Sequence, residues 1–89
     1  MDANKFIAKC NEVRELYVET KKVMILAENV DKDKDAYLMS LNELRNAFDH
    51  FMRILSITDE KEIEKQFSLI KDHVARAGYD TCEILALSL

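Results

Sequence analysis

The feature that most constrains the fold of this 89-residue chain is its lack of proline and its single glycine, Gly78. Proline interrupts helices and glycine often ends them, so a chain nearly free of both can form long uninterrupted helices. Apolar residues make up 48% of the sequence and charged residues 34%, a mixture that suits amphipathic helices with solvated outer faces. The length is that of one domain, which we expect to cover residues 1–89.

Apolar residues spaced by four and three predict a first helix over about residues 3–30. Its main stripe consists of Phe6, Cys10, Val13, Tyr17, Thr20, Met24 and Ala27. The adjacent run of Val23, Met24, Ile25 and Leu26 is apolar around the whole circumference of the helix. Such a run needs cover on more than one side, so we expect it to contact a partner helix or a second subunit.

Alternating aspartate and lysine at residues 31–35 separate this helix from a second one, predicted over about 36–55. The predicted core face of the second helix comprises Tyr37, Leu38, Leu41, Leu44, Phe48, Phe51, Met52 and Leu55, and the opposite face holds Glu43, Asn46, His50 and Arg53. The alternating carboxylates also resemble the start of a calcium-binding EF-hand loop. Ala36 stands where that loop requires glycine and Asn42 where it requires glutamate, so a solvated, helix-capping turn is favoured.

A third helix is predicted over about 59–77, where the spacing of four and three returns. Its stripe consists of Ile63, Phe67, Ile70, Val74 and Ala77. Gly78 stands where a left-handed C-cap belongs, and Asp80 with Glu83 resembles a capping box that opens a fourth helix from about residue 81. This fourth helix reaches Leu89 without a stop signal, so we expect either the N-terminal part of a longer protein or a tail that inserts into a groove.

The predicted fold class is all-α: an antiparallel up-down bundle of three long helices and a short fourth, which dimerisation could complete. The interface predicted from the sequence consists of Val23, Met24, Ile25, Leu26, Leu87 and Leu89. This apolar surface favours a non-catalytic helical interaction or oligomerisation module. Its expected partner is a second copy of the chain or another protein.

Composition and charge exclude several other functions. Thirteen basic and seventeen acidic residues give a net charge of -4, so no global positive field attracts nucleic acid. The N-terminus lacks a secretory pattern and no apolar run approaches the roughly 18 residues of a membrane span, which predicts a cytoplasmic protein without membrane contact. Cys10 and Cys82 match no zinc or redox spacing, and a disulfide between them stays open. With one glycine there is no phosphate-binding loop, and we expect neither a cofactor nor a metal.

Arg45, Asn46 and His50 form the one motif that suggests chemistry. An arginine, a polar residue and a histidine a few positions later resemble the signature of the HEPN superfamily of helical-bundle proteins. The resemblance covers residues 45–50 and implies metal-independent RNA cleavage, or RNA binding, by a homodimer. It makes Arg45 and His50 the active pair, with Asn46 positioning the phosphate or the histidine. A histidine can transfer a proton near neutral pH while a guanidinium stabilises the phosphorane, so this RNA-processing function is the alternative hypothesis.

Helix geometry weighs against that motif as a site within one chain. A regular helix separates Arg45 and His50 by about 140° around its axis, so their convergence needs a bent helix or two subunits. The i, i+4 spacing of Arg45, Asp49 and Arg53 also favours a salt-bridge ladder on the solvent face. His73, in the third helix, has no ligand motif beside it and is expected at the edge of the core.

Overall fold

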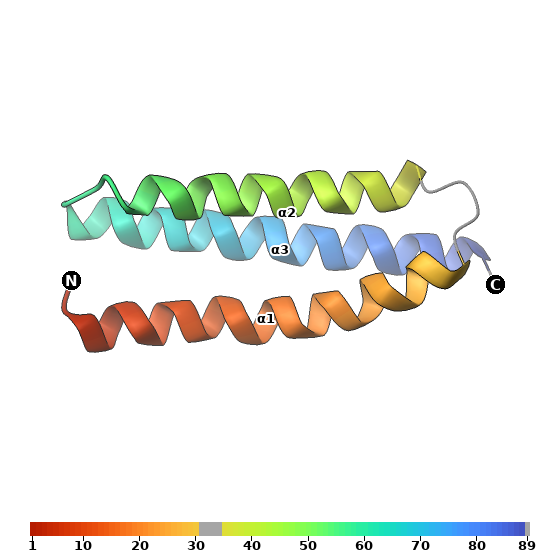
Figure 1. Ribbon diagram of the computed structural model, residues 1–89, viewed down its shortest axis with the longest axis horizontal. Helices are drawn as coiled ribbons and strands as arrows, with labels where there is room; N and C mark the ends of the chain where they lie inside the picture. Colours follow the sequence, from red (N-terminus) through yellow and green to blue (C-terminus); the bar gives the residue numbers. More distant parts are fainter. Residues whose placement is uncertain (31–34, 89) are drawn as a thin grey trace.

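Three helices make up the described part of the chain. The computed structural model describes residues 1–30 and 35–88, in which α1 spans Ala3–Val30, α2 spans Asp35–Ile54 and α3 spans Glu60–Ser88. They run up, down and up along a body 46 Å long, with the two ends of the chain far apart (Figure 1). The predicted all-α class is therefore confirmed. No described helix combines the length and the apolar character that a membrane span needs.

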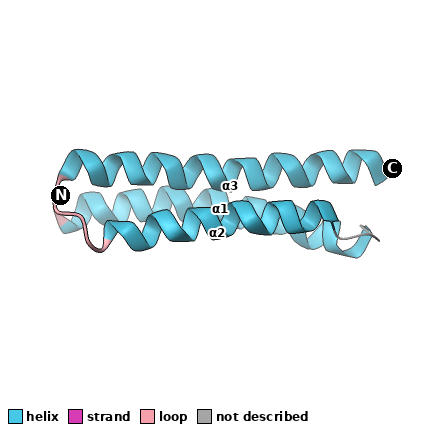
Figure 2. Ribbon diagram, turned by 90° about the horizontal axis from the view of Figure 1, so that it is seen from above, coloured by secondary structure: helices cyan, strands magenta, loops and turns pink. Residues whose placement is uncertain are grey.

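The helix α3 is the central element. It packs against both α1 and α2, whereas α1 and α2 barely contact each other. Figure 1 shows α1 and α2 along opposite edges of the molecule, and Figure 2 shows α3 set off to one side of both. In cross-section the three helices therefore form an open V with α3 at its vertex.

The core lies along α3. Phe67 is 1% exposed and contacts Phe6 of α1 and Phe51 of α2 edge to face, with ring centroids 5.5 Å and 6.4 Å away. This geometry places the positive edge of one ring against the negative face of another. The predicted stripe of Ile63, Phe67, Ile70, Val74 and Ala77 is buried, as its spacing predicts. A single aromatic ring thus joins all three helices.

Local hydrogen bonds fix the helix ends. Asp2 caps α1, because its Oδ1 accepts a hydrogen bond from the Lys5 amide at 2.8 Å and its carbonyl accepts one from the Phe6 amide at 3.0 Å. At the end of α2, the amides of residues 55–57 bond to carbonyls three residues earlier, which tightens the last turn. The observed bounds of α1 and α2 agree with the predicted bounds to within one residue.

The predicted helix end at Gly78 and the predicted fourth helix from residue 81 are wrong. Both positions lie inside α3, which continues without a break to Ser88. Gly78 faces α1, and a Cβ placed on it would lie 3.3 Å from Thr20 Oγ1, closer than an ordinary contact. The hydroxyl of Thr20 is itself held at this contact, since it donates a hydrogen bond to the carbonyl of Val74 at 3.4 Å. The glycine therefore permits a close approach of two helices and does not cap one.

Small buried residues bring α2 close to α3. Ser40 and Thr81 are fully buried, and their hydroxyl oxygens lie 2.8 Å apart. Thr81 donates to the carbonyl of Ala77 at 2.7 Å, and Ser40 donates either to Thr81 or to the same carbonyl, 3.2 Å away. Both hydroxyls are thus satisfied inside the core. Ala47 and Ile54 continue this inward face of α2.

Ion pairs line the outer edge between α1 and α3. Lys5 Nζ lies 2.7 Å from a Glu64 oxygen and 3.2 Å from a Glu60 oxygen, and Lys71 Nζ lies 3.3 Å from a Glu12 oxygen. The hydrogen bond to Glu64 raises the pKa of Lys5, and the same hydrogen bond lowers the pKa of Glu64. Because these side chains are solvated, they contribute little to stability and serve to align α1 with α3.

Candidate docking surface

The apolar stripe of α2 points away from the core. The sequence pattern places it on a core face, but five of its large side chains are exposed: Leu38, Leu41, Phe48, Met52 and Leu55. For these five residues the prediction is wrong. Ser40 and Ala47 allow a close approach to α3, so α2 turns its small residues inward and its larger apolar residues to the side. We call these five exposed residues the α2 stripe; Leu38, Leu41, Phe48 and Met52 lie on α2, and Leu55 lies in the turn directly after it.

An open groove runs between α1 and α2, with α3 as its floor. One hollow of about 190 Å³ is lined by Val13, Tyr17, Leu44, Ala47, Phe48, Phe51, Ile70 and Val74. A second hollow of about 170 Å³ shares Tyr17 and Leu44 with the first, so the two form one continuous groove. The other residues that line it are Lys21, Met24, Ile25, Tyr37 and Leu41. The α1–α2 groove and the α2 stripe overlap at Leu41 and Phe48, and together they form the candidate docking surface.

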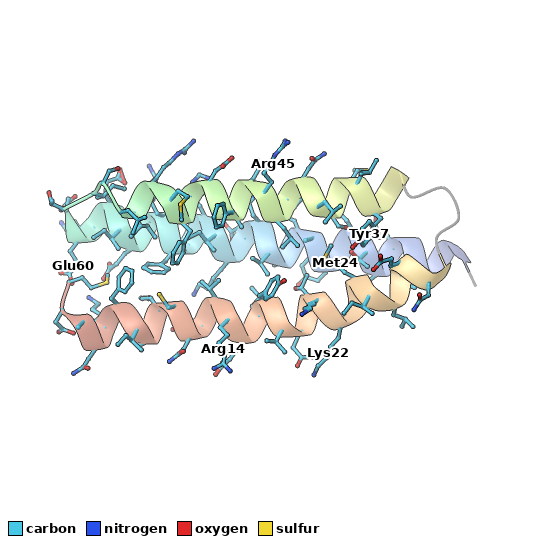
Figure 3. The ribbon with its side chains drawn as sticks, in the orientation of Figure 1. Arg14, Lys22, Met24, Tyr37, Arg45 and Glu60 are labelled. Carbon is cyan, nitrogen blue, oxygen red and sulfur yellow. The ribbon has the colours of Figure 1, made fainter. Side chains whose placement is uncertain are left out.

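Charged side chains lie mainly outside the groove. Figure 3 shows Arg14 and Lys22 pointing outward from α1, and Arg45 pointing outward from α2. Met24 and Tyr37 line the same hollow from the two opposite helices. Lys21 is the charged residue among those that line the groove. The surface is therefore suited to an apolar partner.

The interface residues predicted on α1 lie on different sides of that helix. Met24 is buried inside the chain, whereas Val23 lines a separate hollow of about 210 Å³ between α1 and α3. Ile25 lines the groove and is exposed, and Leu26 is also exposed. The side chain of Leu87 and the whole of Leu89 lie outside the described residues. Of the six predicted residues, Met24 and Ile25 thus line the groove, and Ile25 is the exposed one.

Arg45 and His50 point in different directions within the chain. Arg45 is exposed and points outward from α2 (Figure 3). His50 instead faces α3, where it stacks on His73. The two imidazole rings have centroids 5.2 Å apart and planes inclined by 17°. Asn46, the third residue of the motif, is half-buried. Any pairing of Arg45 with His50 therefore needs a second subunit, and the resemblance to HEPN proteins stays a prediction.

The two histidines belong to a polar seam between α2 and α3. His73 Nδ1 lies 2.7 Å from Glu43 Oε2, and His50 Nδ1 lies 2.7 Å from Gln66 Oε1. A proton on Nδ1 of each ring can be donated to the facing oxygen, which fixes the orientation of both rings. Among the described residues, no group of three or more His, Cys, Asp or Glu is arranged to hold a metal ion. The seam holds α2 against α3 on the side away from the groove.

Two further predictions concern the first turn and the cysteines. The calcium motif of residues 31–35 falls mostly on residues 31–34, which lie outside the described residues. Cys10 and Cys82 are free thiols, so no disulfide joins them. Cys10 packs against the core, where burial raises the pKa of its thiol, whereas Cys82 is exposed.

Comparison with known proteins assigns no function to the chain, so a function can be proposed only from the docking surface. No family model, curated protein or solved structure matches the chain. The α2 stripe was not predicted as an interface. Its helical spacing nevertheless marks these residues as one apolar face. Helical spacing does not indicate whether such a face is covered by the same chain or by another one.

Proposed function

We propose that this protein is a non-catalytic helical interaction module that binds a further helix over the α1–α2 groove and the α2 stripe. The observation that carries the proposal is the row of large apolar side chains exposed along one side of α2. Leu41 and Phe48 are seven residues apart on α2, the spacing of a helix–helix seam, and Leu55 follows seven residues later in the turn after the helix. Monomeric proteins rarely leave a continuous apolar patch of this kind open to water.

The shape of the surface supports the same proposal. The walls of the groove are two helices, and its floor is the buried face of a third, at Ile70 and Val74. A helix laid in this groove would close the open V into a four-helix bundle. Burial of the exposed side chains supplies the driving force, since apolar burial contributes about 25 cal/mol per Å².

Replacing Phe48 with glutamate is expected to weaken helix binding at least about tenfold, because the substitution removes an apolar contact and would bury a charge. The probe is a designed amphipathic peptide with leucine at the a and d positions of each heptad, titrated into labelled protein while amide resonances are followed by NMR. Residues that line the groove should show the largest shifts. Met39→Glu is the matched control, since Met39 lies on the same helix, is 59% exposed against 61% for Phe48, and is not among the groove residues.

Both variants should unfold at nearly the wild-type temperature, because the two side chains are exposed and surface substitutions cost little. If Phe48→Glu loses peptide binding and Met39→Glu does not, the loss is due to the changed surface and not to unfolding. Wild-type protein that is monomeric at the concentration used, and whose groove resonances do not move in the titration, contradicts the proposal. Equal weakening by Phe48→Glu and Met39→Glu contradicts the placement of the surface.

RNA processing, the alternative function, makes a different prediction. If the module is non-catalytic, RNA incubated with wild type, Arg45→Ala or His50→Ala in EDTA should be cleaved equally little by all three. The physical reason is that Arg45 and His50 face different directions and cannot act on one phosphate within a chain. Cleavage by wild type that both substitutions abolish would instead support a HEPN-like ribonuclease. A matched control is Arg76→Ala, an exposed arginine of α3.

A further inference from the structure

We infer that the helix docked on this surface is α2 of a second copy of the chain, packed antiparallel about a two-fold axis. The inference rests on the proposed function and names its partner. Its basis is the arrangement of the α2 stripe, which is self-complementary. In a two-fold interface, if residue i contacts residue j of the other copy, then j must also contact i.

The apolar residues of the α2 stripe are placed symmetrically along the helix. Leu38 and Leu55 lie at equal distances on either side of the midpoint between residues 46 and 47, and so do Leu41 and Met52. If two copies of α2 pack antiparallel about this midpoint, Leu38 lies opposite the turn that carries Leu55 of the second copy. In the same register Leu41 meets Met52 of the second copy. Each of these contacts then occurs twice, and every partner in it is an apolar side chain that is exposed in the single chain.

Phe48 lies close to the proposed two-fold axis. The two copies of Phe48 would be offset by about 4.5 Å along the helices, because an α-helix rises about 1.5 Å per residue. An axial offset this small allows the two rings to reach the centroid separations of about 4.5–7 Å at which aromatic pairs pack favourably. Phe48, the most exposed of the large apolar residues that line the groove, would thus be covered by Phe48 of the second copy.

Charge complementarity also favours the antiparallel arrangement. Arg45 and Asp49 are one turn apart on the same side of α2, at the solvent edge of the stripe. In the antiparallel register Arg45 is offset along the helices by about 1.5 Å from Asp49 of the second copy and by about 4.5 Å from Arg45 of the second copy, so the carboxylate is the nearer of the two charges. A parallel pair in register would place Arg45 directly beside Arg45. In the part of the chain that the structure describes, neither side chain is engaged in an ion pair, so the predicted salt-bridge ladder through Arg45, Asp49 and Arg53 is not formed and both are available to a second copy.

The exposed apolar area of the α2 stripe supplies a large part of a dimer interface. The five side chains of the α2 stripe are between 40% and 72% exposed. An aromatic side chain presents about 200 Å² when fully open and a leucine or methionine somewhat less, so the stripe offers at most about 500 Å² per copy. A standard protein interface buries about 800 Å² per partner. The rim of α1 adds Tyr17 and Ile25, which are also exposed.

The arrangement does not create the HEPN-like site. Arg45 lies on the outer edge of α2, while His50 is turned toward His73 of its own chain. Near the two-fold axis Arg45 therefore pairs with a carboxylate of the second copy and not with a histidine. Under this inference Arg45 determines the orientation of the two copies.

Sedimentation equilibrium over a range of concentrations tests the inference first. Wild-type protein should behave as a dimer that dissociates on dilution. Arg45→Asp and Asp49→Arg should each raise the dissociation constant at least about tenfold, because each places like charges side by side twice per dimer. The double variant Arg45→Asp/Asp49→Arg should restore dimerisation, and Arg76→Asp, a charge reversal on α3, should leave it unchanged. Failure of the double variant to recover contradicts the proposed pairing.

Disulfide trapping tests the direction of the two helices. In a Cys10→Ala/Cys82→Ser background, a mixture of Leu41→Cys and Met52→Cys proteins should form the mixed disulfide under mild oxidation. Either protein alone should form much less of its own disulfide. Dominant self-linkage of Leu41→Cys indicates a parallel pair and overturns the inference.

The two proposals fail in different ways. A wild-type protein that remains monomeric at millimolar concentration overturns the second-copy inference. If that monomer still binds the designed amphipathic peptide through its groove, the proposed function stands and its partner is another protein. If it binds no peptide either, both proposals are wrong.

Discussion

Replacement of Phe67 by alanine is expected to lower the free energy of unfolding by about 3–5 kcal/mol, the typical cost of removing a buried phenylalanine. Phe67 is 1% exposed and holds Phe6 and Phe51 edge to face, so the cavity would open where all three helices meet. For a domain of this size, with a total of roughly 5–15 kcal/mol, the loss is a large share. Urea denaturation followed by circular dichroism measures it.

Two further variants keep this prediction testable. Phe67→Leu retains most of the volume and should cost only about 1 kcal/mol, so the protein stays folded enough for a full transition. Tyr79→Ala removes a comparable ring from the same helix at a position that is 73% exposed, and should change stability by less than about 0.5 kcal/mol. A loss at Tyr79 as large as the loss at Phe67 would contradict this description of the core.

Replacement of Gly78 by leucine is expected to lower the free energy of unfolding by about 1–3 kcal/mol, because the side chain must enter the tight contact between α1 and α3. A single Cβ at this position would already lie 3.3 Å from Thr20 Oγ1. Thermal unfolding measures the change. If Gly78 were instead the end of a helix, leucine would be strained by its backbone and not by α1.

A double-mutant cycle separates these two explanations. In a Thr20→Ala background the oxygen nearest to the added methyl is gone, so Gly78→Ala should stabilise the protein by up to about 1 kcal/mol through helix propensity. In the wild-type background part of that gain is lost to crowding against Thr20. Destabilisation of similar size in both backgrounds would mean that Thr20 is not the cause.

Helical periodicity was sufficient to predict most of the fold. The bounds of α1 and α2 follow from apolar residues that recur with the helical repeat and from the charged break at residues 31–35. The stripe of α3 is buried for the same reason. Gly78 could not be interpreted correctly from the sequence, because a glycine that ends a helix and one that admits a neighbouring helix look alike. Only the position of Thr20 distinguishes them.

The orientation of α2 could not be predicted from its sequence for a different reason. Periodicity identifies the most apolar face of a helix, here the face of Leu41 and Phe48, and assigns it to the core. The contact with α3 is instead made by Ser40 and Ala47, whose small side chains permit close packing. The face was therefore predicted correctly as the apolar one, but its burial against the rest of the chain was predicted wrongly. Its sequence does not distinguish burial by the same chain from burial by another.

The candidate site was predicted only in part. Ile25 was assigned to an interface from the run of apolar residues around α1, and it lines the groove. The stacking of His50 on His73 depends on the register between α2 and α3, which no local pattern specifies. The pairing of Glu43 with His73 was missed for the same reason.

The separation of α1 from α2 also bears on how the groove could adapt. Each of these helices is held by its own contacts with α3 and almost none with the other. The width of the groove is therefore set by where α1 packs on α3, at the ring contact of Phe6 with Phe67 and at the close approach of Thr20 to Gly78. A change in that width would leave the hydrogen bond between Ser40 and Thr81 intact. Receiving bulkier side chains would alter the α1–α3 contact and not the α2–α3 contact.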